Sequence, residues 1–201
     1  MSRERTRPLR SETRQQLFVA AAKVFTAEGI VGASVEDICL EAGLTRGALY
    51  SNFGNKDELV MAMLDEHVDQ TIAEMERLIA QSSSVAEYLR VLESSERRRP
   101  GPFGDNSLLH VEFMLYALRN PKYRVRLRKR QERIRKMTLK ILQLDVDQMG
   151  HDFPLSIEQV ADFIVALDTG YMLAELIEPG SYKQGAFSNT LLALRTLWHP
   201  E

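Results

Sequence analysis

The sequence predicts an all-α protein of nine helices. Helix start signals and helix stop signals alternate along the chain at distances typical of helices. No stretch sustains the period-two alternation of apolar and polar residues that marks a half-buried strand. The chain has 201 residues, of which 44% are hydrophobic and 27% are charged, and this composition is typical of a globular protein with a substantial core.

Composition also excludes several classes of protein. With 11 Gly, 7 Pro and one Cys, the chain is not collagen-like, disordered or held together by disulfides. The amino terminus is rich in arginine and has no apolar segment, so we expect no secretory signal and a cytoplasmic protein. The most apolar stretch, residues 163–176, is interrupted by Asp168 and Glu175, and no membrane span is expected.

Capping residues and glycines define the first three helices. The first helix is predicted at residues 11–28. A serine or threonine hydroxyl can accept from the free amides at a helix start, and a glycine can adopt the left-handed conformation after a helix end. The start signals are Ser34 and Thr45, and the stop signals are Gly29, Gly43 and Gly54.

The same signals place the other six helices. Their start signals are Asn55 with Glu58, Ser84 with Glu87, Asn106, Asn120 with Pro121, Ser156 with Gln159, and Lys183. Their predicted ends lie near Ala80 for the first, and near Arg119, Gly150, Glu178 and Trp198 for the last four. Because Pro and Gly disrupt helices, we expect a loop at 97–105 and turns at 151–155 and at Pro179-Gly180.

The second and third helices are joined only by Gly43-Leu44, which is the spacing of a helix-turn-helix. The exposed face of the third helix carries small or hydrogen-bonding groups with one cation, types that fit a DNA major groove. Backbone amides after Ser34 and Thr45 are expected to bind phosphate, with help from Lys56. The alternative is a merely solvated polar face. The residues of that face are Thr45, Arg46, Gly47, Ala48, Tyr50, Ser51 and Asn52.

Charge is distributed unevenly along the chain. The net charge is -2, yet residues 1–56 contain eight Lys or Arg against six Asp or Glu. The excess is concentrated in an arm before the first helix, and we expect this arm to contact DNA phosphates or the minor groove. The arm's arginines are Arg3, Arg5, Arg7 and Arg10.

Residues 13–62 resemble the DNA-binding domain of the TetR family of bacterial regulators, above all in the string AGLTRGALYSNFGNKDEL at 42–59. Cys39 stands where the family usually has Ala, and Asn52 where it often has His. The resemblance implies three DNA-binding helices followed by a regulatory body that dimerises through its last two helices. The domains expected from it are residues 1–56, for the arm and DNA-binding head, and residues 57–201, for effector binding and dimerisation.

The helix predicted at 156–178 is apolar around nearly its whole circumference. A helix of this kind is buried on all sides, either by a second copy of the chain or as a central core helix. The dimer residues expected in this region are Ala166, Gly170, Leu173, Ile177 and Leu192.

The helix predicted at 106–119 is either an ordinary core helix or one wall of an effector pocket. The pocket hypothesis requires a mostly apolar small molecule, because apolar and aromatic side chains predominate there. Arg130 either meets an anionic group of that molecule or extends to solvent. The effector residues expected are His110, Phe113, Met114, Tyr116, Ala117, Arg130, Met137 and Phe163.

Residues 119–140 carry eleven Lys or Arg against Glu132 alone. This run is either a second electrostatic surface or a solvated face balanced by acidic neighbours. No enzymatic motif, metal motif or cofactor motif is found, and none of these is expected. The favoured function is a homodimeric repressor that binds a palindromic double-stranded DNA operator and is released by a small apolar effector. The alternative is a helical enzyme or carrier with a relic DNA-binding head.

Overall fold

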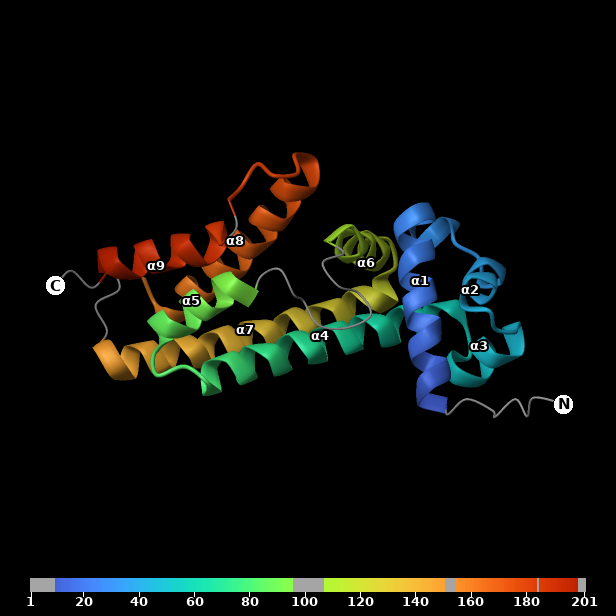
Figure 1. Ribbon diagram of the computed structural model, residues 1–201, viewed down its shortest axis with the longest axis horizontal. Helices are drawn as coiled ribbons and strands as arrows, with labels where there is room; N and C mark the ends of the chain where they lie inside the picture. Colours follow the sequence, from blue (N-terminus) through green and yellow to red (C-terminus); the bar gives the residue numbers. More distant parts are fainter. Residues whose placement is uncertain (1–9, 96–106, 151–154, 184, 199–201) are drawn as a thin grey trace, which may run out of the picture. The chain divides into compact units, whose positions relative to one another are not determined.

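The computed structural model describes residues 10–95, 107–150, 155–183 and 185–198, which contain nine helices and no strand (Figure 1). The all-α prediction is confirmed. The helices are α1 (Arg10–Gly32), α2 (Val35–Ala42), α3 (Arg46–Phe53), α4 (Lys56–Ala80), α5 (Val85–Ser95), α6 (Ser107–Arg119), α7 (Pro121–Met149), α8 (Ile157–Ile177) and α9 (Ala186–Trp198). The predicted loop at 97–105 and the arm carrying Arg3, Arg5 and Arg7 lie outside the described residues.

Two helix boundaries differ from the prediction. Helix α1 breaks at Gly29, whose φ of 73° and ψ of 158° are open to glycine and costly for other residues, and it then resumes for one more turn. The predicted end at residue 28 therefore coincides with the break, and the short helical turn that follows it was not predicted. Helix α9 begins at Ala186, three residues after the predicted start.

The chain divides into two compact units. The first unit comprises Met1–His67 with Gly101–Arg124, and the second comprises Val68–Pro100 with Val125–Glu201. Helix α6 belongs to the first unit because it packs on α1. The boundary predicted after residue 56 therefore lies inside the first unit.

Aromatic and aliphatic side chains form the core of the first unit, where α1 contacts α2, α3 and α6. The rings of Phe18 and Phe53 stack with their centroids 5.3 Å apart. Arg14 lies over both rings, 5.0 Å and 4.6 Å from their centroids. Leu17 and Leu49 beside them are fully buried, so α3 is fixed to α1 through its inner face.

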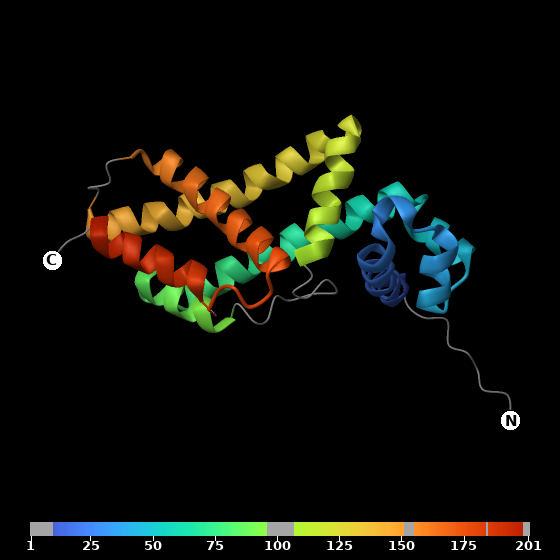
Figure 2. The ribbon, with the colours of Figure 1, turned by 90° about the horizontal axis from the view of Figure 1, so that it is seen from above.

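The second unit has a core in which α5 packs beside α9 (Figure 2). Its largest cluster of buried residues joins α4, α5 and α7, and partly buried residues of α9 pack against it. Burial raises the pKa of Tyr88 in this cluster to about 12. The buried members are Leu78, Val85, Tyr88, Leu89, Met137 and Ile141.

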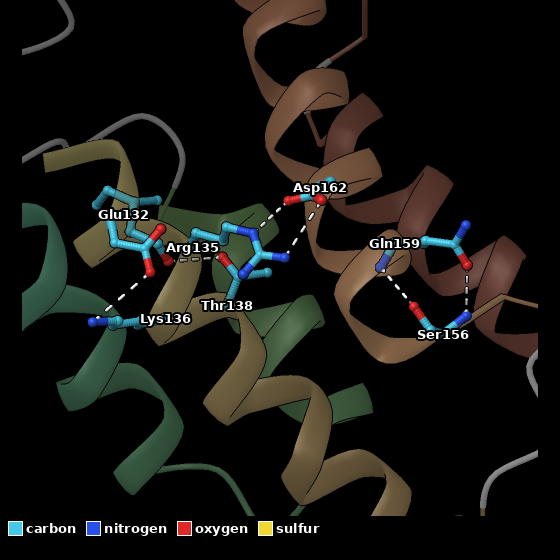
Figure 3. Close-up of polar contacts among 8 residues, drawn as sticks. Glu132, Arg135, Lys136, Thr138, Ser156, Gln159 and Asp162 are labelled. Atoms are coloured by element: carbon cyan, nitrogen blue, oxygen red, sulfur yellow. Dashed lines mark hydrogen bonds and ion pairs between the residues drawn. The ribbon is translucent and has the colours of Figure 1, made fainter. Parts of the chain in front are cut away.

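Ion pairs connect α7 to both C-terminal helices within the second unit. Arg195 of α9 lies 2.9 Å from Asp145 of α7, whose side chain is 3% exposed. Arg135 of α7 binds Asp162 of α8 (Figure 3). The predicted cap of α8 is confirmed, since Ser156 and Gln159 exchange two hydrogen bonds.

Candidate nucleic-acid interface

Helix α2 begins with a complete capping box. The Ser34 hydroxyl accepts from the Asp37 amide at 3.1 Å, and the Asp37 carboxylate accepts from the Ser34 amide at 3.2 Å. The Ser34 hydroxyl and amide both donate to this carboxylate and lower the pKa of Asp37. These bonds fix the start of α2, as its sequence predicted.

The turn between α2 and α3 depends on Gly43. Its φ of 64° is left-handed, and its N–H donates to the carbonyls of Cys39 and Leu40. A Cβ at this position would meet no heavy atom within 4 Å, so the backbone conformation and not the available space favours glycine. Thr45 then caps α3 by accepting from the Ala48 amide at 3.2 Å.

Helix α3 has eight residues and buries one face. Leu49 and Phe53 point into the core and are 0% and 4% exposed. The opposite face is mostly open to solvent, which agrees with the prediction from spacing. The exposed residues at this face are Thr45, Arg46, Gly47, Tyr50 and Ser51, while Ala48 and Asn52 are half-buried.

Arg46 is held between the two helices of the motif. Its Nη1 lies 2.7 Å from the Glu36 carboxylate of α2, and its Nη2 lies 3.5 Å from the Tyr50 hydroxyl of α3. The hydrogen bond to Tyr50 and the charge of Glu36 both raise the pKa of Arg46. All three side chains are exposed at the helix-turn-helix surface, and sequence analysis did not predict the Glu36 contact.

Comparison with known proteins identifies this helical unit. A family model described as "Bacterial regulatory proteins, tetR family" matches residues 17–63. HTH-type transcriptional regulator TtgR of Pseudomonas putida is 46% identical over 61 residues, which are 30% of this chain and 29% of that protein. HTH-type transcriptional regulator UidR of Escherichia coli is 25% identical over 90% of each chain. Residues 17–63 are therefore a TetR-family domain.

A solved structure shares the fold of most of this chain. The transcriptional regulator FadR from Bacillus subtilis, crystallised with stearoyl-CoA, has a TM-score of 0.69. It is 21% identical and covers 89% of this chain and 95% of its own. The TetR-family transcriptional regulator from Cytophaga hutchinsonii is 18% identical, covers 98% of this chain and 100% of its own, and has a TM-score of 0.77. With nine helices in the described residues, the TetR-like architecture predicted from the sequence is confirmed.

Lys56 has an internal structural role that the sequence did not predict. Its ammonium donates to the carbonyls of Ile30 at 2.9 Å and Ala33 at 2.7 Å, near the end of α1. An ammonium has three N–H donors, so two of them are already engaged. Phosphate binding by Lys56 stays a prediction and would use the remaining donor.

Two polar residues of α3 bond to their own helix. The Asn52 side-chain amide donates to the Ala48 carbonyl at 2.8 Å, and the Ser51 hydroxyl donates to the same carbonyl at 3.0 Å. Arg10, at the start of α1, reaches the Ser51 carbonyl at 3.4 Å. Arg46 and Tyr50, which lie on either side of Gly47 on the exposed face, make no such bond to the backbone of α3. Their side chains are therefore the ones best placed to contact DNA.

The expected effector residues are divided between the two units. Phe113, Tyr116 and Ala117 are buried on α6, and His110 and Met114 there are half-buried. The His110 ring lies 6.0 Å from the ring of His67 on α4.

In the second unit, Met137 belongs to the large apolar cluster, whereas Phe163 on α8 is 44% exposed. Arg130 is 3% exposed. The alternative in which Arg130 extends to solvent is therefore wrong.

Two surface hollows lie away from these residues. One, of about 360 Å³, lies between α1 and α2, and the other, of about 410 Å³, lies along α9 and the segment before it. Neither is lined by an expected effector residue, so the effector role stays a prediction.

An aspartate with two tyrosines ties α6 and α7 to α4 within the first unit, and sequence analysis missed it. The Asp57 carboxylate accepts from the hydroxyls of Tyr116 and Tyr123, whose rings stack 5.4 Å apart. Burial alone would raise the pKa of Asp57, but the two hydroxyls lower it. Asp57 lies in the first turn of α4, where acidic side chains are common because they interact favourably with the helix dipole. The sequence around it therefore gave no sign that it binds two tyrosines.

The basic segment of α7 is partly neutralised by acidic neighbours. Arg133 pairs with Asp69 of α4 at 2.6 Å, and Arg135 pairs with Asp162 of α8. Lys136 lies 3.8 Å from Glu132 (Figure 3). These pairs favour the balanced solvated face over a second electrostatic surface.

The described residues contain no group of three or more His, Cys, Asp or Glu side chains placed to hold a metal ion. Cys39 is 4% exposed inside the head, and burial raises the pKa of its thiol, which opposes a nucleophilic role. No helix in the described ranges is long and apolar enough to cross a membrane.

Proposed function

We propose that this TetR-family protein is a DNA-binding transcriptional regulator. The observation that carries the proposal is the capped helix-turn-helix, which buries one face of α3 and exposes the other. Arg46 and Tyr50 project from the exposed face, where an arginine can bind the acceptors of guanine. The capped amide ends of α2 and α3 would bind phosphate and set the orientation of the head.

We further propose that the protein acts as a homodimer formed through α8 and α9. Phe163, Ala166, Gly170, Leu173 and Ile177 recur at spacings of three and four residues on α8 and are all exposed. Ile177 is 85% exposed, which is unusual for a large apolar side chain. A second copy would cover this stripe, and the position of Phe163 within it favours a dimer role over an effector role.

Leu192 is a weaker candidate for the interface than Leu173. It is half-buried and packs against the apolar cluster of α4, α5 and α7 in its own chain. A substitution there would disturb the fold as well as an interface.

A homodimer requires an approximately palindromic operator, because its two heads are related by a two-fold axis. We propose repression as the output, with a small, mostly apolar effector that binds in the body and releases the operator. The similar FadR structure contains stearoyl-CoA, which joins an apolar chain to anionic groups. This supports an effector of the same chemical class, an apolar molecule that carries an anionic group. Helices α4 and α7 each contain residues of both units and are the continuous helical routes for coupling.

One experiment tests the central proposal. The purified chain is incubated with a pool of random DNA duplexes, bound DNA is recovered and sequenced, and the affinity is measured at several salt concentrations. A regulator selects a defined, nearly palindromic sequence, and its affinity falls as salt rises because phosphate contacts release counterions. Recovery of unselected DNA only, with no preferred sequence, would rule out operator recognition.

A further inference from the structure

The ion pair between Glu36 and Arg46 lies at the DNA-facing surface of the head. Glu36 is the second residue of α2, next to the amides that would bind phosphate, and Arg46 is the first residue of α3. Their charged atoms are 2.7 Å apart, and both side chains are more than half exposed, at 56% and 59%. A carboxylate therefore lies where DNA, a polyanion, is expected.

Fold stability does not account for this pair. Exposed ion pairs contribute roughly 0–1 kcal/mol, because water screens the charges and the side chains lose freedom. A carboxylate near phosphates also repels them, so Glu36 lowers affinity for DNA in general unless its charge is balanced. A role in selecting among DNA sequences explains both its position and its partner.

We propose that Glu36 is a positioning residue that sets base preference by holding Arg46 in one orientation. The inference rests on the proposed DNA-binding function and adds a determinant of its specificity. Glu36 contacts one terminal nitrogen of Arg46, and Tyr50 lies 3.5 Å from the other. The guanidinium has five N–H donors, so enough remain free to bind the two acceptors of a guanine.

The pair also limits what Arg46 can do elsewhere on DNA. An arginine without a partner is free to reach phosphate oxygens, which are present at every sequence. When Arg46 is bound to Glu36, its charge is already partly balanced, so a contact with phosphate adds less binding energy. A contact with a base adds most where the base edge matches the fixed orientation of the guanidinium. Removal of the carboxylate should therefore raise affinity for mismatched DNA more than for matched DNA.

The test compares two glutamates of the same helix. Glu41, near the other end of α2, pairs with Lys23 of α1, also at 2.7 Å and also at the surface. Both Glu36→Gln and Glu41→Gln remove one exposed ion pair and one negative charge. Each variant and the wild type are measured on the duplex that the wild type selects from a random pool, and on its single-base variants, at several salt concentrations.

For Glu36→Gln we expect discrimination at the guanine contacted by Arg46 to fall about 10-fold, within the range that a bidentate base contact supplies. The slope of log affinity against log salt should become steeper by about 0.9, which corresponds to one additional phosphate contact. Glu41→Gln should leave both quantities unchanged, and thermal unfolding should show that both variants fold.

Two further outcomes decide the mechanism. In an Arg46→Ala background, Glu36→Gln should no longer alter base preference, because the residue it positions is absent. If base preference changes equally in that background, Glu36 contacts DNA by itself and the positioning role is overturned. If the wild type selects a sequence but Glu36→Gln keeps its discrimination and salt slope, the inference fails while DNA binding stands. A wild type that selects no sequence overturns the proposed function and this inference together.

Discussion

The carboxylate of Glu112 on α6 accepts a hydrogen bond from the backbone N–H of Ile30 at 3.0 Å, directly after the break in α1. The same carboxylate would lie 3.2 Å from a Cβ placed on Gly29. The short turn after the break is thus bound at its amide end by a residue 82 positions away in sequence. This contact fixes α6 to α1 within the first unit.

Replacement of Gly29 by alanine should destabilise the protein by about 1–3 kcal/mol, because its backbone conformation is nearly restricted to glycine. The new Cβ would also press against Glu112. Urea unfolding measures the loss. Gly43→Ala is the matched control: its left-handed conformation has open space around the new Cβ, and it should cost about 1–2 kcal/mol. Equal stability of Gly29→Ala and the wild type would contradict the account of the break.

Asp57→Asn should cost about 1–3 kcal/mol, because the hydroxyls of Tyr116 and Tyr123 lose an ionised acceptor. The folded pKa of Asp57 is lowered, so its contribution is complete above the ordinary aspartate pKa of about 3.9 and is lost as pH falls through the folded value. Stability measured from pH 7 to pH 2 should therefore decline less steeply at acid pH in the variant. If stability declines equally steeply at acid pH in the variant and the wild type, protonation of the Asp57 carboxylate is not coupled to folding.

Lys56→Ala should affect both stability and DNA affinity, whereas Arg46→Ala should affect DNA alone. The first change leaves the carbonyls of Ile30 and Ala33 without their donor and should cost about 1–2 kcal/mol. Arg46→Ala removes an exposed side chain and should keep the melting temperature, while it loses about 1–3 kcal/mol of base discrimination. Melting curves and operator titrations of the two variants check this separation. A stable Lys56→Ala variant with wild-type DNA affinity would remove Lys56 from both roles.

Leu173→Glu should produce monomers with weak operator affinity, since it places a charge on the proposed dimer face of α8. Sedimentation at micromolar concentration measures the oligomeric state, and titration of the selected duplex measures affinity. Leu118→Glu, at a side chain 55% exposed on α6, is the control and should remain dimeric. A wild type that is monomeric under these conditions would contradict the proposed dimer.

An effector should raise the melting temperature and lower operator affinity. A thermal-shift screen of apolar acids, neutral lipophiles and drugs finds ligands, and each hit is then titrated in the presence of operator. A coupling of about 1–3 kcal/mol would weaken operator binding about 5- to 150-fold. If every stabilising ligand leaves operator affinity unchanged, regulation by such ligands fails, although DNA binding survives.

Local signals predicted most of the fold and the surface of the head. Ser34, Gly43 and Thr45 each act on backbone groups within a few residues, so their roles could be read from the sequence. Contacts between distant residues produced no such signal. Glu112 and Ile30, like Asp57 and its two tyrosines, come together only when helices pack. The dimer residues expected on α8, which are Ala166, Gly170, Leu173 and Ile177, are all exposed. A helix that is apolar around its whole circumference gave no sign of which face its own chain would leave open.

The ion pair of Asp145 with Arg195 has a consequence for how this chain can change over generations. The aspartate side chain is 3% exposed, and the two residues lie 50 positions apart on α7 and α9. Loss of either residue alone leaves its buried partner without compensation, which is strongly destabilising, whereas replacement of both by well-packed apolar residues is often neutral. Descendants of this sequence should therefore keep both charges or lose both, and an alignment of its relatives should show these two positions varying together.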